Sequence, residues 1–334
     1  MRRCFIISLF LIGALFLVPW LCTPGVKQEE LPPEEEQSGE KEPEAVQPEK
    51  LDALQLLRVK RGDKIETMTM ETYLRGVLRA EMPASFHQEA LKAQTVAART
   101  YVLHKTYGGA PASHPEADVC DDIGCCQAFK EEREAAADWG AMTLQYEEKI
   151  RAAVSATDGQ VVIYDEKPVL AVFHSSSSGA TRNAEEVWSS SVPYLKSVAS
   201  PENGELVPNY YGQAGFTPEE FKLLFLSSYP DAALGGDPLN WFSNIQQEET
   251  GTVASLQVGG VPLTGVELRK ILGLRSAAFT ISFEKGEIVF STTGYGHGVG
   301  MSQYGANYMA SQGETYDKIL TTYYTGVKIC DMNE

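Results

Sequence analysis

The sequence has few basic residues relative to acidic ones. Its 334 residues contain 28 lysines and arginines but 45 aspartates and glutamates, which gives a formal net charge of −17. Because nucleic-acid binding needs a basic surface, this composition argues against nucleic acid as a partner. The glycine-rich stretch over residues 294–306 lacks the Gly-Lys-Ser/Thr ending of a phosphate-binding loop, and this excludes that type of site there. The sequence has no internal repeat, and 43% of it is hydrophobic, which is enough for a sizeable core.

The N-terminus carries an apolar run over residues 4–22, directly after Arg2 and Arg3. Its 19 residues have about the length that a transmembrane helix needs. The Pro-Trp-Leu sequence before Cys22 is a poor cleavage site, both for a secretory signal peptide and for a lipoprotein signal. We therefore predict an uncleaved anchor over residues 1–22, with a cleavable signal as the alternative. The two arginines place the N-terminus in the cytoplasm and the rest of the chain outside it.

Residues 23–50 contain nine glutamates and three lysines, several prolines and almost no large apolar side chains. Such a segment cannot bury enough surface to fold, so we predict a disordered, self-repelling linker. The folded domain is then expected over residues 51–330.

The pattern of that domain predicts an α+β fold, a single domain of mixed helices and strands. A helix over residues 70–82 follows from apolar residues at i, i+3 and i+4, with Thr69 as N-cap and a stop before Pro83. A second helix should begin at Ser85, with Gln88 completing a capping box. Further helices are expected over 131–142, 217–230, 265–274 and, as two short ones, 300–327. Strands are expected over 152–179, with turns at 158–159 and 166–167, and over 276–294.

One acidic residue, Glu81, lies on the apolar stripe of the first predicted helix. Desolvation there would disfavour the charged form and raise its pKa, and a carboxyl group that stays protonated near neutral pH can act as a general acid. The alternative is an ordinary glutamate, exposed or paired with Arg79 or Arg99. The helix pattern alone favours this alternative.

Four blocks of the sequence change that balance, because they resemble the family of stage II sporulation protein D, which also contains amidase-enhancer proteins. They are "YLRGVLRAEMPASFHQEALKAQTVAARTYVLHK", "AVFHSSSSGATRNAEEVW", "GLRSAAFTI" and "GYGHGVGMSQYGANYMA". They occur in the family's order and cover most of residues 65–329. The last block is the most specific.

The resemblance implies a lytic transglycosylase that cuts the β-1,4 bond after N-acetylmuramic acid in peptidoglycan and leaves a 1,6-anhydro sugar. It places the catalytic carboxylate at Glu81. A hydrolase that activates water commonly needs two carboxylates. In transglycosylation the C6 hydroxyl of the substrate is the nucleophile, so one carboxyl group can act first as acid and then as base.

The same blocks suggest residues of a central glycan cleft. Hydroxyl, amide and imidazole groups can bind sugar hydroxyls and N-acetyl groups. The expected substrate contacts are Gln94, Arg99, Tyr101, His174, Ser175, Ser176, His297, Gln303 and Tyr304. Each set also has a purely structural interpretation: helix packing for the first three, a polar turn for the serine run, and a tight turn with a packed histidine for the last block.

A separate cluster in the sequence contains His114, Cys120, Cys125 and Cys126. Four soft ligands within thirteen residues suit a tetrahedral zinc site, although their spacing does not match common zinc fingers. Members of the family often have His-Cys-Gln where this chain has Cys-Cys-Gln, and a histidine can also bind zinc. We predict a structural zinc ion near the cleft. A disulfide, which is reasonable outside the membrane, and free thiols are the alternatives.

The resemblance also implies a setting for the protein. It would be a single-pass protein of the mother-cell membrane that acts on glycan strands stripped of stem peptides during engulfment. Its partners would be an amidase–endopeptidase and a polytopic membrane protein. The main alternative is a non-catalytic amidase enhancer that binds the cell wall. A metal-dependent hydrolase is a third interpretation, but the sequence offers no second cluster of ligands for it.

Overall fold

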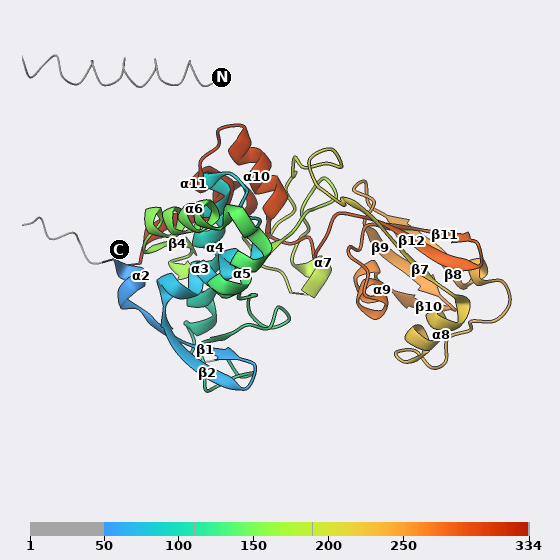
Figure 1. The fold of residues 1–334 in the computed structure, drawn as a ribbon. Helices are drawn as coiled ribbons and strands as arrows, with labels where there is room; N and C mark the ends of the chain where they lie inside the picture. Colours follow the sequence, from blue (N-terminus) through green and yellow to red (C-terminus); the bar gives the residue numbers. More distant parts are fainter. Residues whose placement is uncertain (1–49, 110, 189, 333–334) are drawn as a thin grey trace, which may run out of the picture. The chain divides into compact units, whose positions relative to one another are not determined.

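The computed structural model describes residues 50–109, 111–188 and 190–332 (Figure 1). The predicted anchor over residues 1–22 and nearly all of the predicted linker lie outside these residues. Within the described ranges, no helix is both long enough and apolar enough to cross a membrane. These residues contain both helices and strands, so the mixed composition expected of an α+β protein is confirmed.

Two successive helices, α3 (Met70–Glu81) and α4 (Gln88–Thr106), lie at the centre of the first half of the fold. The side chain of Thr69 caps α3 by accepting a hydrogen bond from the backbone N–H of Thr72, as predicted. The predicted capping box at Ser85 is wrong. Residues 83–86 form a turn in which the N–H of Phe86 donates to the carbonyl of Pro83, and α4 begins at Gln88 without a side-chain cap.

The first hydrophobic core surrounds α3 and α4. The other helices that contribute to it are α5 (Glu132–Trp139), α6 (Thr143–Ala156), α10 (Gln303–Ser311) and α11 (Tyr316–Tyr323). The short helix α2 (Leu51–Leu54) precedes β1. One mixed sheet has the order β2-β1-β3. Its strands are β1 (Leu56–Arg61), β2 (Lys64–Thr69), which is antiparallel to β1, and β3 (Val119–Cys120), which is parallel to β1. A second sheet has the order β14-β4-β5. Its strands are β4 (Gln160–Tyr164), β5 (Lys167–Pro168) and β14 (Lys328–Asp331).

Helix α6 corrects the sequence prediction, which assigned residues 152–156 to a strand and no helix to residues 143–151. Ile150, Ala153 and Val154 are buried at helical spacing, and α6 packs against both α3 and α4. Packing against neighbours therefore decides the structure of a segment whose own pattern is ambiguous.

Two sheets and two helices in the second half of the fold surround a second core (Figure 1). This core is rich in aromatic side chains, including Phe221, Phe225 and Phe290. Strands β8 (Phe242–Gln247), β9 (Val253–Val258) and β10 (Val261–Leu263) form one sheet, and β7 (Tyr211–Phe216), β11 (Phe279–Glu284) and β12 (Glu287–Thr293) form another. Helices α8 (Pro218–Leu226) and α9 (Gly265–Leu272) both begin at a threonine capping box.

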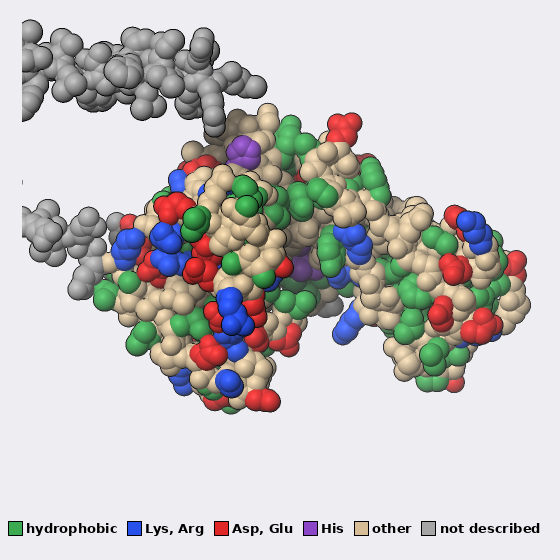
Figure 2. Space-filling view, viewed as in Figure 1, with side chains coloured by type: hydrophobic (Ala, Val, Ile, Leu, Met, Phe, Trp, Pro, Cys, Tyr) green, Lys and Arg blue, Asp and Glu red, His purple; other side chains and the backbone are tan. Residues whose placement is uncertain are grey.

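Two short strands at the first core position the polar motifs of the sequence. Strand β6 (Phe173–His174) pairs in parallel with β13 (Met301–Ser302), which brings the serine run beside the start of α10. Helix α7 (Glu185–Trp188) follows the serine run. On the face shown in Figure 2, acidic and basic side chains are intermixed. Ion pairs such as Arg58–Asp118 and Lys60–Glu116 join opposite charges.

Candidate active site

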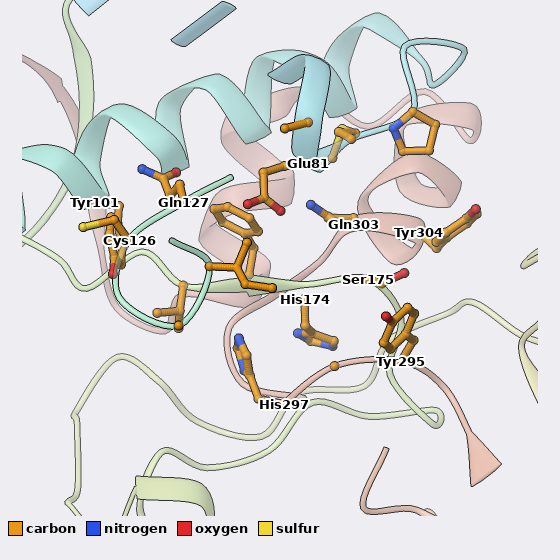
Figure 3. A pocket seen from close by; sticks show the side chains of 18 of the residues that line it. Glu81, Tyr101, Cys126, Gln127, His174, Ser175, Tyr295, His297, Gln303 and Tyr304 are labelled. Carbon is orange, nitrogen blue, oxygen red and sulfur yellow. The ribbon is translucent and has the colours of Figure 1, made fainter. Parts of the chain in front are cut away.

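Glu81 is the last residue of α3 and lines a cavity of about 870 Å³. His174, His297 and Tyr295 lie across this cavity from Glu81, and Gln303 and Tyr304 come from the start of α10 (Figure 3). A further wall is formed by residues 123–127, which include two of the clustered cysteines. Segments that are far apart in the sequence thus surround one carboxyl group.

The carboxyl group of Glu81 has little to stabilise its charged form. Its Oε1 accepts a 2.7 Å hydrogen bond from the backbone N–H of Ala128. Burial raises the pKa of Glu81, and the hydrogen bond from Ala128 offsets this only in part. Glu81 has no salt-bridge partner among the described residues. The two arginines considered as partners are engaged elsewhere, Arg79 with Glu147 and Arg99 with Asp52.

The two histidines of the cavity are held in opposite tautomers by one residue. Nδ1 of His174 lies 3.2 Å from the carbonyl oxygen of Val299 and must donate to it, because a carbonyl oxygen can only accept. The N–H of Val299 in turn donates to Nδ1 of His297 over 3.1 Å, so the proton of a neutral His297 is on Nε2. Burial lowers the pKa of His174 to about 4 and that of His297 to about 3, so both rings are neutral near pH 7.

The glycine-rich motif shapes the backbone that carries His297. Glycines 294, 296, 298 and 300 all have positive φ angles, between 71° and 120°. At Gly300 an added Cβ would also come within 2.2 Å of the carbonyl oxygen of Val172, so only glycine fits there. The motif is a tight turn, as the structural interpretation held, and it still places His297 at the cavity.

A buried carboxylate that the sequence analysis missed joins the serine run to α10. Oε1 of Glu202 accepts hydrogen bonds from the N–H and hydroxyl of Ser177 and from the hydroxyl of Ser302, and Oε2 accepts one from Ser200. Glu202 is 3% exposed. An added Cβ at Gly305 would lie 2.6 Å from its Oε2, which explains the glycine in the first turn of α10. No local pattern in the sequence marks Glu202, since its partners are up to 100 residues away.

The expected substrate contacts separate into two groups. Six of the nine expected substrate contacts line the cavity, as Glu81 does: Tyr101, His174, Ser175, His297, Gln303 and Tyr304. The other three do not. Arg99 is fully buried with Asp52 and the carbonyl of Gln160, so it lies in the core instead of the expected cleft. Gln94 is buried behind the wall, where it accepts a hydrogen bond from Gln303, and Ser176 is buried beside the cavity.

The structure brings His114, Cys120, Cys125 and Cys126 together. Their ligand atoms all lie within 4.8 Å of one another, and the three sulfurs are not joined in disulfides. Nδ1 of His114 lies 3.2 Å from the carbonyl of Ala117, which leaves Nε2 directed toward the sulfur of Cys126 at 3.4 Å. Such an orienting backbone contact is usual for a metal-binding histidine, so this donor set fits a tetrahedral zinc ion.

Similarity to known proteins places the chain in a family. The family model described as stage II sporulation protein matches residues 59–164. Stage II sporulation protein D of Bacillus subtilis (strain 168) is 39% identical over 272 residues, which cover 81% of this chain and 77% of that protein. The chain belongs to the stage II sporulation protein D family.

Two further relatives extend the comparison. Stage II sporulation protein D of Bacillus amyloliquefaciens is 38% identical over 268 residues, which cover 80% of this chain and 76% of that protein. An amidase enhancer of Bacillus subtilis (strain 168) is 31% identical over 305 residues, which cover 77% of this chain but 40% of that protein. In this member of the stage II sporulation protein D family, the matched segment 59–164 contains both Glu81 and the cysteine cluster.

Proposed function

We propose that this protein is a membrane-anchored lytic transglycosylase that cleaves peptidoglycan glycan strands during endospore engulfment. The observation that carries the proposal is the environment of Glu81, a carboxyl group at a large cavity with one backbone hydrogen bond and no ion pair among the described residues. Burial raises the pKa of Glu81, which favours the protonated form that a general acid requires.

The chemistry needs a single carboxyl group. Glu81 donates its proton to the glycosidic oxygen as the bond from that oxygen to the anomeric carbon of N-acetylmuramic acid breaks. The C6 hydroxyl oxygen of the same sugar forms a new bond to this carbon, and the Glu81 carboxylate accepts the hydroxyl proton. The acid is thereby regenerated and no water is consumed. Residues around the cavity, such as Ser175 and Gln303, would orient the strand.

A structural zinc ion would suit the wall of the cavity. His114, Cys120, Cys125 and Cys126 would supply four ligands, and a closed set of protein ligands is typical of a structural site rather than a catalytic one. Burial raises the pKa of Cys126 to about 12, so a bound cation would be needed to keep this sulfur as a thiolate. The ion would fix residues 120–126, which end two residues before Ala128, whose amide binds Glu81.

The wider setting is part of the same proposal. The protein would be held by residues 1–22 in the mother-cell membrane, with the catalytic domain outside the cytoplasm. Its substrate would be glycan whose stem peptides an engulfment amidase–endopeptidase has removed, and a polytopic membrane protein would complete the assembly. The relation to an amidase enhancer supports a cell-wall setting and keeps one alternative open, a non-catalytic protein that binds the wall and stimulates another hydrolase.

Product analysis on purified glycan strands without stem peptides tests the proposal. The protein alone should release fragments that end in 1,6-anhydro-N-acetylmuramic acid, each lighter by one water than a hydrolysed end, as measured by mass spectrometry. Glu81→Gln should fold but lose about 10²–10⁴-fold in rate, because an amide cannot exchange the proton. Glu71→Gln is the matched control, since Glu71 lies on the same helix and pairs with Arg75. Release of no fragments by the wild-type protein would favour the enhancer instead.

A further inference from the structure

Two aromatic side chains lie exposed where the cavity opens, and the proposed chemistry assigns them no role. Trp188 is 41% exposed and Tyr295 is 48% exposed, and both line the cavity that contains Glu81. Single exposed apolar residues are common on protein surfaces. Here two large rings line the same cavity, and each ring packs against another side chain: Tyr295 against Arg275 and Trp188 against His297.

Tyr295 is fixed by both its backbone and its ring. Its N–H donates to the carbonyl of Ser176 over 2.8 Å, and its own carbonyl accepts from the N–H of Ser176 over 3.0 Å. The guanidinium carbon of Arg275 lies 4.5 Å from the centre of the ring. One face of the ring is therefore covered, and its phenol side chain lies near Ser175 and His174 in the cavity (Figure 3).

Trp188 ends α7 and is supported in a similar way. Its N–H donates to the carbonyl of Ala184 over 2.8 Å. Its indole lies against the ring of His297, with 5.2 Å between centres and 50° between planes. Because burial lowers the pKa of His297 to about 3, this neighbour is a neutral ring and not a cation near pH 7. With 41% of Trp188 exposed, part of the indole remains open to solvent.

These surfaces suit a pyranose ring. The faces of a sugar ring carry C–H groups, which are attracted to the electron-rich face of an aromatic ring, while its edge carries hydroxyl groups that need polar partners. The cavity offers both kinds of surface, aromatic at Trp188 and Tyr295 and polar at Ser175. We infer that Trp188 and Tyr295 form an aromatic platform on which sugar rings of the bound glycan stack, remote from the side of the cavity that Glu81 occupies.

This inference rests on the proposed function, and its test separates the two. The full chain carrying Glu81→Gln serves as the parent, because it should bind glycan without cleaving it. Its affinity for glycan strands of alternating N-acetylglucosamine and N-acetylmuramic acid, free of stem peptides, is measured by calorimetry. Trp188→Ala and Tyr295→Ala in this parent should each raise Kd about threefold to tenfold. Tyr295→Phe keeps the ring and should bind like the parent.

A matched control is available at Tyr211, an exposed tyrosine on β7 that does not line the Glu81 cavity. Tyr211→Ala should leave Kd unchanged. Trp188→Leu and Tyr295→Leu keep an apolar side chain but remove the aromatic face. If these variants are folded and still bind glycan more weakly than the parent, unfolding is excluded as the cause. If the parent binds glycan and the Ala and Leu substitutions at both positions leave Kd unchanged, the platform inference is overturned and the proposed function is not. A parent that binds no glycan overturns the proposed function and the platform with it.

Discussion

The backbone N–H of Ala128 donates a 2.7 Å hydrogen bond to Oε1 of Glu81. Ala128 lies two residues after Cys126, and Tyr101 holds the same loop through a hydrogen bond from its hydroxyl to the carbonyl of Cys125. The loop that brings the cysteines together therefore also orients the candidate catalytic acid. This relationship links the stability of the cysteine loop to the geometry of the cavity.

The first prediction concerns the dependence of stability on pH. Because burial raises the pKa of Glu81 in the folded protein, the protonated carboxyl stabilises the fold below the unfolded pKa near 4.5, and this contribution is lost as pH rises through the folded pKa. Glu81→Gln stays neutral and keeps an oxygen for the Ala128 amide. It should therefore melt at a higher temperature than wild type at pH 7, by a margin that disappears below pH 4. A margin that is constant with pH would contradict the raised pKa.

The second prediction concerns metal removal. The purified protein should contain about one zinc ion per chain, and a strong chelator should remove it, lower the melting temperature and speed hydrogen exchange at the Ala128 amide. Cys126→Ser should lose the metal. Cys330→Ser changes a cysteine on β14 that lies outside the cluster, so this variant should keep its zinc ion. Metal-free protein with a Cys120–Cys126 disulfide, identified by mass spectrometry, would rule out the zinc site.

The third prediction concerns Glu202. Four donors converge on its two oxygens, so Glu202→Leu would remove the acceptor of the Ser177 N–H and of three hydroxyl groups. Leaving a buried polar group unsatisfied costs about 1–3 kcal/mol, and denaturant unfolding should show a loss of stability of at least that order. The exposed Glu205, three residues away, provides the control: Glu205→Leu should have little effect. Equal unfolding midpoints for the two variants would refute the role of the buried carboxylate.

Local signals in the sequence were sufficient for several elements. The apolar stripe and the Thr69 cap determine α3, because they depend on contacts within one or two turns of helix. The position of Glu81 on that stripe and the close spacing of the three cysteines could likewise be read directly. Trp188 and Tyr295 lie inside the blocks that resemble the family, but a sequence pattern does not show which aromatic side chains remain exposed.

The rest was decided by tertiary packing, which joins residues too far apart for any local pattern to relate. Arg99 shares its helix with Gln94 and Tyr101, yet it is buried with Asp52, 47 residues away, and not in the cavity. Glu202 accepts a hydrogen bond from Ser302, which is 100 residues away. The sequence by itself determined α3, its cap and the presence of an acid on its apolar face. Only the tertiary structure decided that this acid meets the Ala128 amide and no cation among the described residues, because burial and charge pairing depend on the whole fold.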